Sequence, residues 1–163
     1  MNEVNLQDKI RDCKKCPLHE FMGTAPVPPE WVGQSKVMFI TDTLITMDHD
    51  YAQTPLFGAT RLRFIQLIEK YFDSWYITPL VKCSPKSATH SVKNIKICTD
   101  WIDHEIEVIK PKVIIGCGLK MDKYVGCNYY TMSAARITQS GKHEKIFEEL
   151  LKKIKGDING KNL

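Results

Sequence analysis

The hydrophobic positions of the chain fall into short continuous runs, which predict the strands of a sheet. Uninterrupted apolar runs bounded by polar or glycine residues are typical of strands buried on both faces. Three such runs cover residues 36–42, 75–81 and 112–118, and a shorter one covers residues 129–131. We therefore predict a sheet of four strands.

Between these runs the apolar residues recur at three- and four-residue spacing, which predicts helices. The expected helices cover residues 4–13, 60–72, 92–109, 119–125 and 142–155. Prolines between residues 17 and 29 predict an irregular loop there, because proline lacks a backbone donor. The alternation predicts one α/β domain over residues 1–155, a three-layer α/β/α fold with a small, mostly parallel four-stranded sheet. Residues 156–163 are expected to form a flexible tail.

Composition and charge narrow the function class without choosing one. The 163 residues include 43% hydrophobic and 26% charged residues, and the net charge is +4. So mild a charge does not by itself identify a nucleic-acid binder. No apolar run approaches the roughly 18 residues that a membrane span needs, and the first residues show no signal-peptide pattern. We therefore expect an intracellular protein of a reducing compartment, the cytoplasm.

Four of the cysteines are spaced as metal ligands are: Cys13 and Cys16, with two residues between them, and Cys83 and Cys98 farther along. A two-residue spacer lets both thiolates converge on one metal centre, and in a reducing compartment cysteines favour metals over disulfides. The alternative is that they are buried structural cysteines, since a free cysteine behaves as a small hydrophobe. Four thiolates suit zinc as well as an iron-sulfur cluster, so spacing alone leaves the metal open.

The cysteines lie within strings that resemble those of one known family. The string of residues 76–83, Y-I-T-P-L-V-K-C, resembles the Y-I-T-N-V-V-K-C strand of family 4 uracil-DNA glycosylases. Residues 55–58, P-L-F-G, resemble the P-F-V-G of that family, and residues 109–118 resemble its helix-to-strand phrase ending in L-G. With the opening C-x-x-C-P-L of residues 13–18, these strings follow the family order.

This resemblance implies a uracil-DNA glycosylase-like fold that grips DNA. It also implies a 4Fe-4S cluster with a structural role, held by Cys13, Cys16, Cys83 and Cys98. Zinc is the lesser alternative.

The departures from the family pattern fall on its base pocket. The G-E-A-P-G motif after the first strand is replaced by Thr41 to Ile45, so its glycines and proline are gone. The stacking phenylalanine falls at Leu56, unless Phe57 takes over by a one-residue shift, and the base-reading asparagine falls at Pro79. The histidine loop H-P-S aligns with Met132-Ser133-Ala134. Together these changes remove base recognition, stacking and leaving-group stabilisation, which predicts an inactive or altered enzyme.

Asp42 is the one candidate catalytic residue that remains. It holds the position of the family's pocket carboxylate, at the start of a loop off the first strand's carboxyl end. Such loops hold ligands in open α/β sheets. A role in activating water is one interpretation, and a strand-end aspartate that only caps the loop is the other.

Basic residues gather in sequence near the cysteines and near the expected pocket, where phosphate contact is one interpretation and ordinary solvated faces the other. They are Lys14, Lys15, Arg61, Arg63, Lys82, Lys86, Lys93 and Lys96. Our candidate nucleic-acid contacts are Phe57, Arg61, Lys82 and Lys86.

Three functions follow from these observations. The first is an iron-sulfur protein, catalytically inactive or altered, that binds DNA or acts with a DNA polymerase or another replication or repair protein. The second is an active glycosylase that removes uracil or another damaged base. The third is a zinc-stapled protein-interaction module with no role on nucleic acid.

Overall fold

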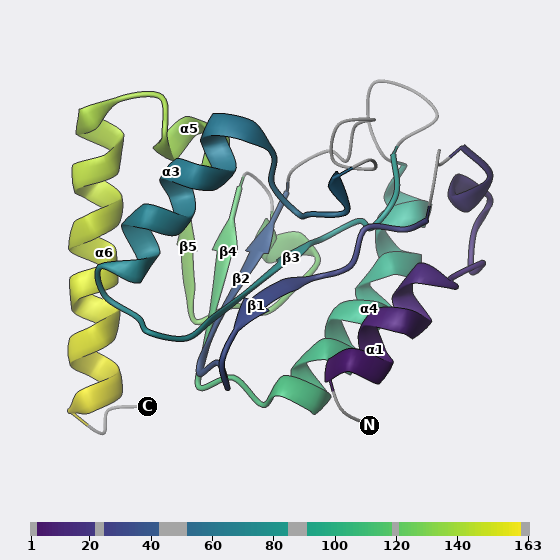
Figure 1. Ribbon diagram of the computed structural model, residues 1–163, viewed down its shortest axis with the longest axis horizontal. Coiled ribbons are helices and arrows are strands. Elements are labelled where there is room, and N and C mark those ends of the chain that lie inside the picture. Colours follow the sequence, from purple (N-terminus) through teal and green to yellow (C-terminus); the bar gives the residue numbers. More distant parts are fainter. Residues whose placement is uncertain (1–2, 22–24, 43–51, 85–90, 119–120, 161–163) are drawn as a thin grey trace.

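The computed structural model, which describes residues 3–21, 25–42, 52–84, 91–118 and 121–160, has a mostly parallel five-stranded sheet with helices on both faces (Figure 1). The strand order is β1-β3-β2-β4-β5. The strands are β1 (Glu30–Val32), β2 (Val37–Thr41), β3 (Trp75–Pro79), β4 (Val113–Cys117) and β5 (Tyr129–Thr131). Among the strands of the described residues, only β1 runs antiparallel to its neighbour. The predicted α/β fold class is confirmed.

The helices divide between the two faces of the sheet (Figure 1). On one face α1 (Glu3–Arg11) packs along α4 (Val92–Ile109). On the other face α3 (Gly58–Glu69), α5 (Ala134–Ile137) and α6 (Gly141–Asn159) pack against one another. Two short 3-10 helices, Pro17–Phe21 and Met121–Lys123, lie in the connections. No helix within the described ranges is both long and apolar enough to cross a membrane.

Alternation along the central strands builds a core on each side. Successive side chains of a strand point to opposite faces, so Phe39 of β2 packs in the core under α3 and α6, while Met38 and Ile40 pack in the core under α4. In the first core the Phe39 ring meets Phe64 edge-on at 5.7 Å, and Phe64 stacks on Phe147 at 5.3 Å. The continuous apolar run of β2 therefore reflects burial on both faces.

Three boundaries differ from the sequence prediction. The sheet has five strands rather than four, because β1 comes directly after the predicted proline-rich loop of residues 17–29, in a stretch for which the sequence predicts no strand. Three residues are too few to show a strand period, and β1 takes its pairing from β3, with Glu30 opposite Ile77. The predicted helix over residues 119–125 is only the turn Met121–Lys123 within the described residues. Helix α6 continues to Asn159, so the first residues of the expected tail are helical.

Register brings the ends of the central strands to one edge. Thr41 of β2 lies beside Pro79 of β3 on one side and beside Cys117 of β4 on the other. Because the three strands are parallel, this is their shared carboxyl edge, where open α/β sheets bind ligands.

Candidate functional site

Asp42 follows β2 at this carboxyl edge and is held against the end of β4. Its backbone N–H donates to the Cys117 carbonyl oxygen at 3.0 Å. Its carboxylate lies where a side chain at residue 118 would be, since a Cβ there would come within 1.9 Å of Asp42 Cγ. Gly118 also has φ +143°, a conformation that favours glycine. The structure thus explains the glycine that ends β4, whereas a role for Asp42 in activating water stays a prediction.

The two residues aligned with the stacking phenylalanine differ in exposure. Leu56 is 1% exposed and belongs to the core under α3 and α6, whereas Phe57, just before α3, is 46% exposed. The one-residue shift therefore places an aromatic ring at the surface. Contact between Phe57 and nucleic acid stays a prediction.

Two further pocket positions serve the scaffold. Pro79 is buried and offers only its carbonyl oxygen, which accepts a hydrogen bond from Lys82 Nζ at 2.9 Å. The segment aligned with the histidine loop starts α5: Ser133 caps it by accepting from the Arg136 backbone N–H at 3.4 Å. Of the replaced first motif, Thr41 is fully buried, and its hydroxyl has no hydrogen-bond partner in the described part of the chain. Residues 43–45 lie outside the described residues.

The four spaced cysteines lie in two clusters of side chains on the α4 side of the sheet. Cys83 follows β3 and Cys98 lies in the second turn of α4, at 4% and 5% exposure, and Cys16 packs in the same cluster of side chains. Cys13, just after α1, packs against Trp101. Within the described ranges, however, no three His, Cys, Asp or Glu side chains are grouped closely enough to be a formed metal site. Ligation by these cysteines therefore stays a prediction.

The surroundings of Cys13 and Cys98 act on their sulfurs in different ways. The Trp101 indole Nε1–H donates to Cys13 Sγ at 3.1 Å. Burial raises the pKa of the Cys98 thiol, and a hydrogen bond from the Lys82 backbone and the Lys82 charge oppose that rise; Cys16 and Cys13 raise the pKa further. N–H donors to ligand sulfurs are what cysteine-bound metals and clusters use to orient and stabilise thiolates. The donor set therefore fits a thiolate-bound metal or cluster in its chemistry.

Lys82 corrects one of the sequence predictions. Its side chain is 1% exposed, and its ammonium lies 3.1 and 3.0 Å from the two carboxylate oxygens of Glu105, which is fully buried. It also donates to the Thr78 hydroxyl, which in turn donates to Glu105 at 2.8 Å. Burial raises the pKa of Glu105, and Lys82 is the strongest opposing influence. The prediction that Lys82 contacts phosphate is wrong for the folded chain, because its charge is enclosed and paired.

The other predicted cations are placed in different settings. The Arg61 guanidinium forms a two-pronged ion pair with Glu30 of β1, and this contact raises the pKa of Arg61. Its contact with nucleic acid stays a prediction, and Lys86 lies outside the described residues. Lys93 and Lys96 are exposed at the start of α4, where they help line a hollow of about 500 Å³. They are therefore better placed for phosphate than Lys82.

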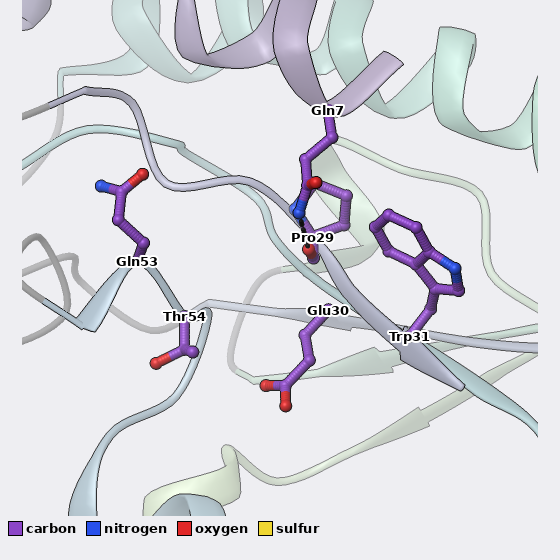
Figure 2. Close-up of a pocket in the computed structure, with 6 residues that line it drawn as sticks. All are labelled: Gln7, Pro29, Glu30, Trp31, Gln53 and Thr54. Carbon is purple, nitrogen blue, oxygen red and sulfur yellow. Dashed lines mark hydrogen bonds between the residues drawn. The ribbon is translucent and has the colours of Figure 1, made fainter. Parts of the chain in front are cut away.

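A second hollow, of about 310 Å³, lies beside β1 (Figure 2). The Gln7 side chain donates to the Pro29 carbonyl oxygen at 3.4 Å, and Gln53 donates to the Ala25 carbonyl oxygen at 3.0 Å. The Trp31 ring stacks on Tyr76 with 6.1 Å between centroids. These contacts tie neighbouring segments to the edge strand, so we assign this hollow to the scaffold.

Sequence reasoning missed Trp101 and Glu105, the residues of α4 that contact the cysteine-bearing segments. Their signal was present: with Cys98 they are spaced three and seven residues along a helix, which places all three on one face.

Comparison with known proteins agrees with the resemblance. No protein-family model matches the chain. It is 28% identical over 140 residues to a type-4 uracil-DNA glycosylase of Sulfurisphaera tokodaii, covering 80% of this chain and 63% of that protein. It is 29% identical over 125 residues to the one of Saccharolobus solfataricus, covering 74% and 57%. A third, from Pyrobaculum aerophilum, is 28% identical over 123 residues, covering 73% and 62%.

The chain thus spans less than two thirds of the length of these relatives. The matches nevertheless cover most of its own length, and the mostly parallel sheet with helices on both faces is consistent with such a fold. These similarities support membership of the type-4 uracil-DNA glycosylase superfamily for this chain.

Proposed function

We propose that the chain is an iron-sulfur, DNA-binding protein of glycosylase-like fold in which uracil excision is lost or strongly altered. One observation carries the altered chemistry: the position of the base-reading asparagine is occupied by Pro79, at the carboxyl edge beside Thr41. Proline has no side-chain hydrogen-bonding group, and its carbonyl oxygen is already used by Lys82. A site that reads its substrate by hydrogen bonds loses discrimination by about 10⁴ when such a bond is absent.

The proposed cluster is a 4Fe-4S group held by Cys13, Cys16, Cys83 and Cys98. When bound, it supplies a covalent staple between the segment after α1, the end of β3 and the start of α4. The burial of Cys83 and Cys98 and the N–H donor to Cys13 support this assignment. Zinc on the same thiolates is the alternative.

The proposed DNA contact uses Lys93 and Lys96 in place of Lys82. Both are exposed, and both lie within a few residues of Cys98 on α4. Lys15, beside the cysteine pair, reaches the same surface and bonds Asp100 at 3.3 Å. These ammonium groups can approach phosphates without breaking a buried ion pair.

An active glycosylase is the second candidate. It is favoured by Asp42, whose carboxylate is held at the carboxyl edge against Gly118. The position of Asp42 is the observation that supports this candidate, because a carboxylate that activates water must lie within reach of the substrate.

DNA binding is tested by anisotropy with a single-stranded, uracil-containing oligonucleotide between about 50 and 200 mM salt. Affinity should fall with a log-log slope of about −0.7 for each phosphate neutralised. Replacing Lys93 and Lys96 together by alanine should make the slope shallower by the amount expected for about two phosphate contacts. The matched control is the same change at Lys145 and Lys152, exposed on α6 across the sheet, which should leave the slope unchanged (Figure 1). No binding at about 50 mM salt would contradict the proposal and favour a protein partner.

The same preparation tests the cluster and the chemistry. It should be brown and contain iron with acid-labile sulfide, whereas a zinc protein would be colourless. Single-turnover incubation followed by alkali should give no strand cleavage above the buffer control. Cleavage that Asp42→Asn abolishes would overturn the loss of uracil excision and establish the second candidate.

A further inference from the structure

One face of α4 carries three buried residues that are expected ligands or contact the cysteine-bearing segments. Cys98, Trp101 and Glu105 are 5%, 8% and 0% exposed. Cys98 is itself an expected ligand. Trp101 contacts the segment of Cys13, and Glu105 binds Lys82, the residue before Cys83. The helix therefore joins both cysteine-bearing segments.

Trp101 donates a hydrogen bond to an expected metal ligand, in addition to its packing contacts. Its Nε1–H points at Cys13 Sγ, 3.1 Å away. Leu6 and Ile10 of α1, both fully buried, pack with it. Lys15 Nζ lies 4.7 Å from the centroid of the Trp101 ring. The indole is thus held in place by contacts with α1 and with the segment of Cys13.

An indole N–H can only donate, and a buried donor needs an acceptor. A thiolate is a stronger acceptor than a thiol, because hydrogen bonds to ionised groups are stronger. The contact therefore directs a fixed donor at the atom of Cys13 that would bind a metal. It also favours any state of a bound group that places more negative charge on that sulfur, and hydrogen bonds to cluster sulfurs are among the factors that set the reduction potential.

We propose that Trp101 is a positioning residue of the cysteine centre: its indole N–H orients the Cys13 sulfur for ligation and stabilises the more reduced state of the group bound there. This inference rests on the proposed ligation by Cys13, and it adds a residue outside the ligand set. The ring and the N–H have separable roles, which makes the inference testable.

The experiment compares three variants of the full chain, purified with its metal. Trp101→Phe keeps an aromatic ring and removes the N–H, and Trp101→Leu removes both. Trp75→Phe is the matched control, because it removes an indole N–H that donates to Glu69 Oε1 at 3.3 Å in the core on the other face of the sheet. The readouts are the metal content, the rate of metal release to a chelator and the midpoint reduction potential.

We expect Trp101→Phe and Trp101→Leu to release metal about 10- to 100-fold faster, as outer-shell changes at metal sites do. Both should have a lower reduction potential than the wild type, and Trp75→Phe should match the wild type in both readouts. If Trp101→Phe matches Trp75→Phe while the wild type carries iron, this inference is overturned and the cluster proposal stands. If the wild type carries zinc, the iron proposal fails and metal release alone decides the role of Trp101. If it carries no metal, both proposals fail.

Discussion

The buried ion pair between Lys82 and Glu105 gives the sharpest stability prediction. In Lys82→Met the ammonium is removed and the Glu105 carboxyl is left fully buried, with the Thr78 hydroxyl still donating to it. Removing one partner of a buried pair costs about 3 to 5 kcal/mol. An independent figure agrees: holding a carboxyl of ordinary pKa 4.5 neutral at pH 7 costs about 3 kcal/mol, at about 1.36 kcal/mol per pKa unit.

Urea unfolding at pH 7, with iron content checked on each sample, measures this loss. With a slope near 2 kcal/mol per molar urea, the midpoint should fall by about 1.5 to 2.5 M. The double change Lys82→Met with Glu105→Gln should recover most of it, because the amide keeps the acceptor for Thr78 without a charge. The single variant should also regain stability as the pH falls from 7 toward 5, because the folded state then binds the proton more tightly than the unfolded state.

Lys70→Met is the matched surface control. Its ammonium bonds Glu148 at 2.7 Å, but the Lys70 side chain is 49% exposed, so its loss should cost under about 1 kcal/mol. A Lys82→Met protein that is no less stable than the Lys70→Met protein would refute the reasoning. A double variant no more stable than Lys82→Met would do the same.

Two further predictions concern the carboxyl edge and the packing of α3 on α6. Gly118→Ala should lower the melting temperature, because φ is +143° and the new Cβ would lie 1.9 Å from Asp42 Cγ. Gly156→Ala is the matched control inside α6, where the new Cβ meets open space, and it should raise stability by about 0.5 to 1 kcal/mol. Equal melting temperatures of the two variants would contradict this reasoning. The hydrogen bonds from Arg63 lower the pKa of Glu144 below 4.5, so this pair stabilises the fold above that pH and the stabilisation is lost as pH falls through the lowered value. Arg63→Gln should therefore lower the stability only slightly at pH 7, and this difference from the wild type should vanish in urea melts near pH 3.

The fold could be predicted where the pattern extends over many residues. The runs around Phe39 and Ile115 became central strands because burial on both faces leaves an uninterrupted apolar signal. Strand β1 could not be predicted, since three residues after a run of prolines carry no period and their pairing depends on β3. At the site, the spacing of the cysteines predicts that distant segments converge on one metal. Cys16, Cys83 and Cys98 pack in the same hydrophobic cluster, and their convergence on a metal stays a prediction.

The sequence prediction put Lys82 at the surface because it lies close in sequence to Cys83 and to other basic residues, whereas its side chain is buried. Two signals pointed the other way: a lysine within the run Leu80-Val81-Lys82-Cys83, and Glu105 on the buried stripe of α4. Core residues on both sides of a charged residue indicate that its side chain is buried, and charged side chains are rarely buried unless they are paired. Taken together, the apolar run around Lys82 and the buried stripe around Glu105 predict that the two side chains pair.

The end of β3 explains how base-reading chemistry can change without loss of the scaffold. Lys82 donates to the carbonyl oxygen of Pro79, an atom that any residue at that position would supply. The Leu80 backbone N–H donates to the Thr41 carbonyl oxygen at 2.8 Å, so the pairing with β2 continues past the proline. A substitution at residue 79 therefore changes the side chain offered at the predicted pocket edge, while Lys82 keeps its contacts with the Thr78 hydroxyl, Glu105 and the carbonyl oxygen of residue 79. For this reason the segment of the predicted cysteine ligands and the predicted base pocket can diverge independently, although they share a single strand end.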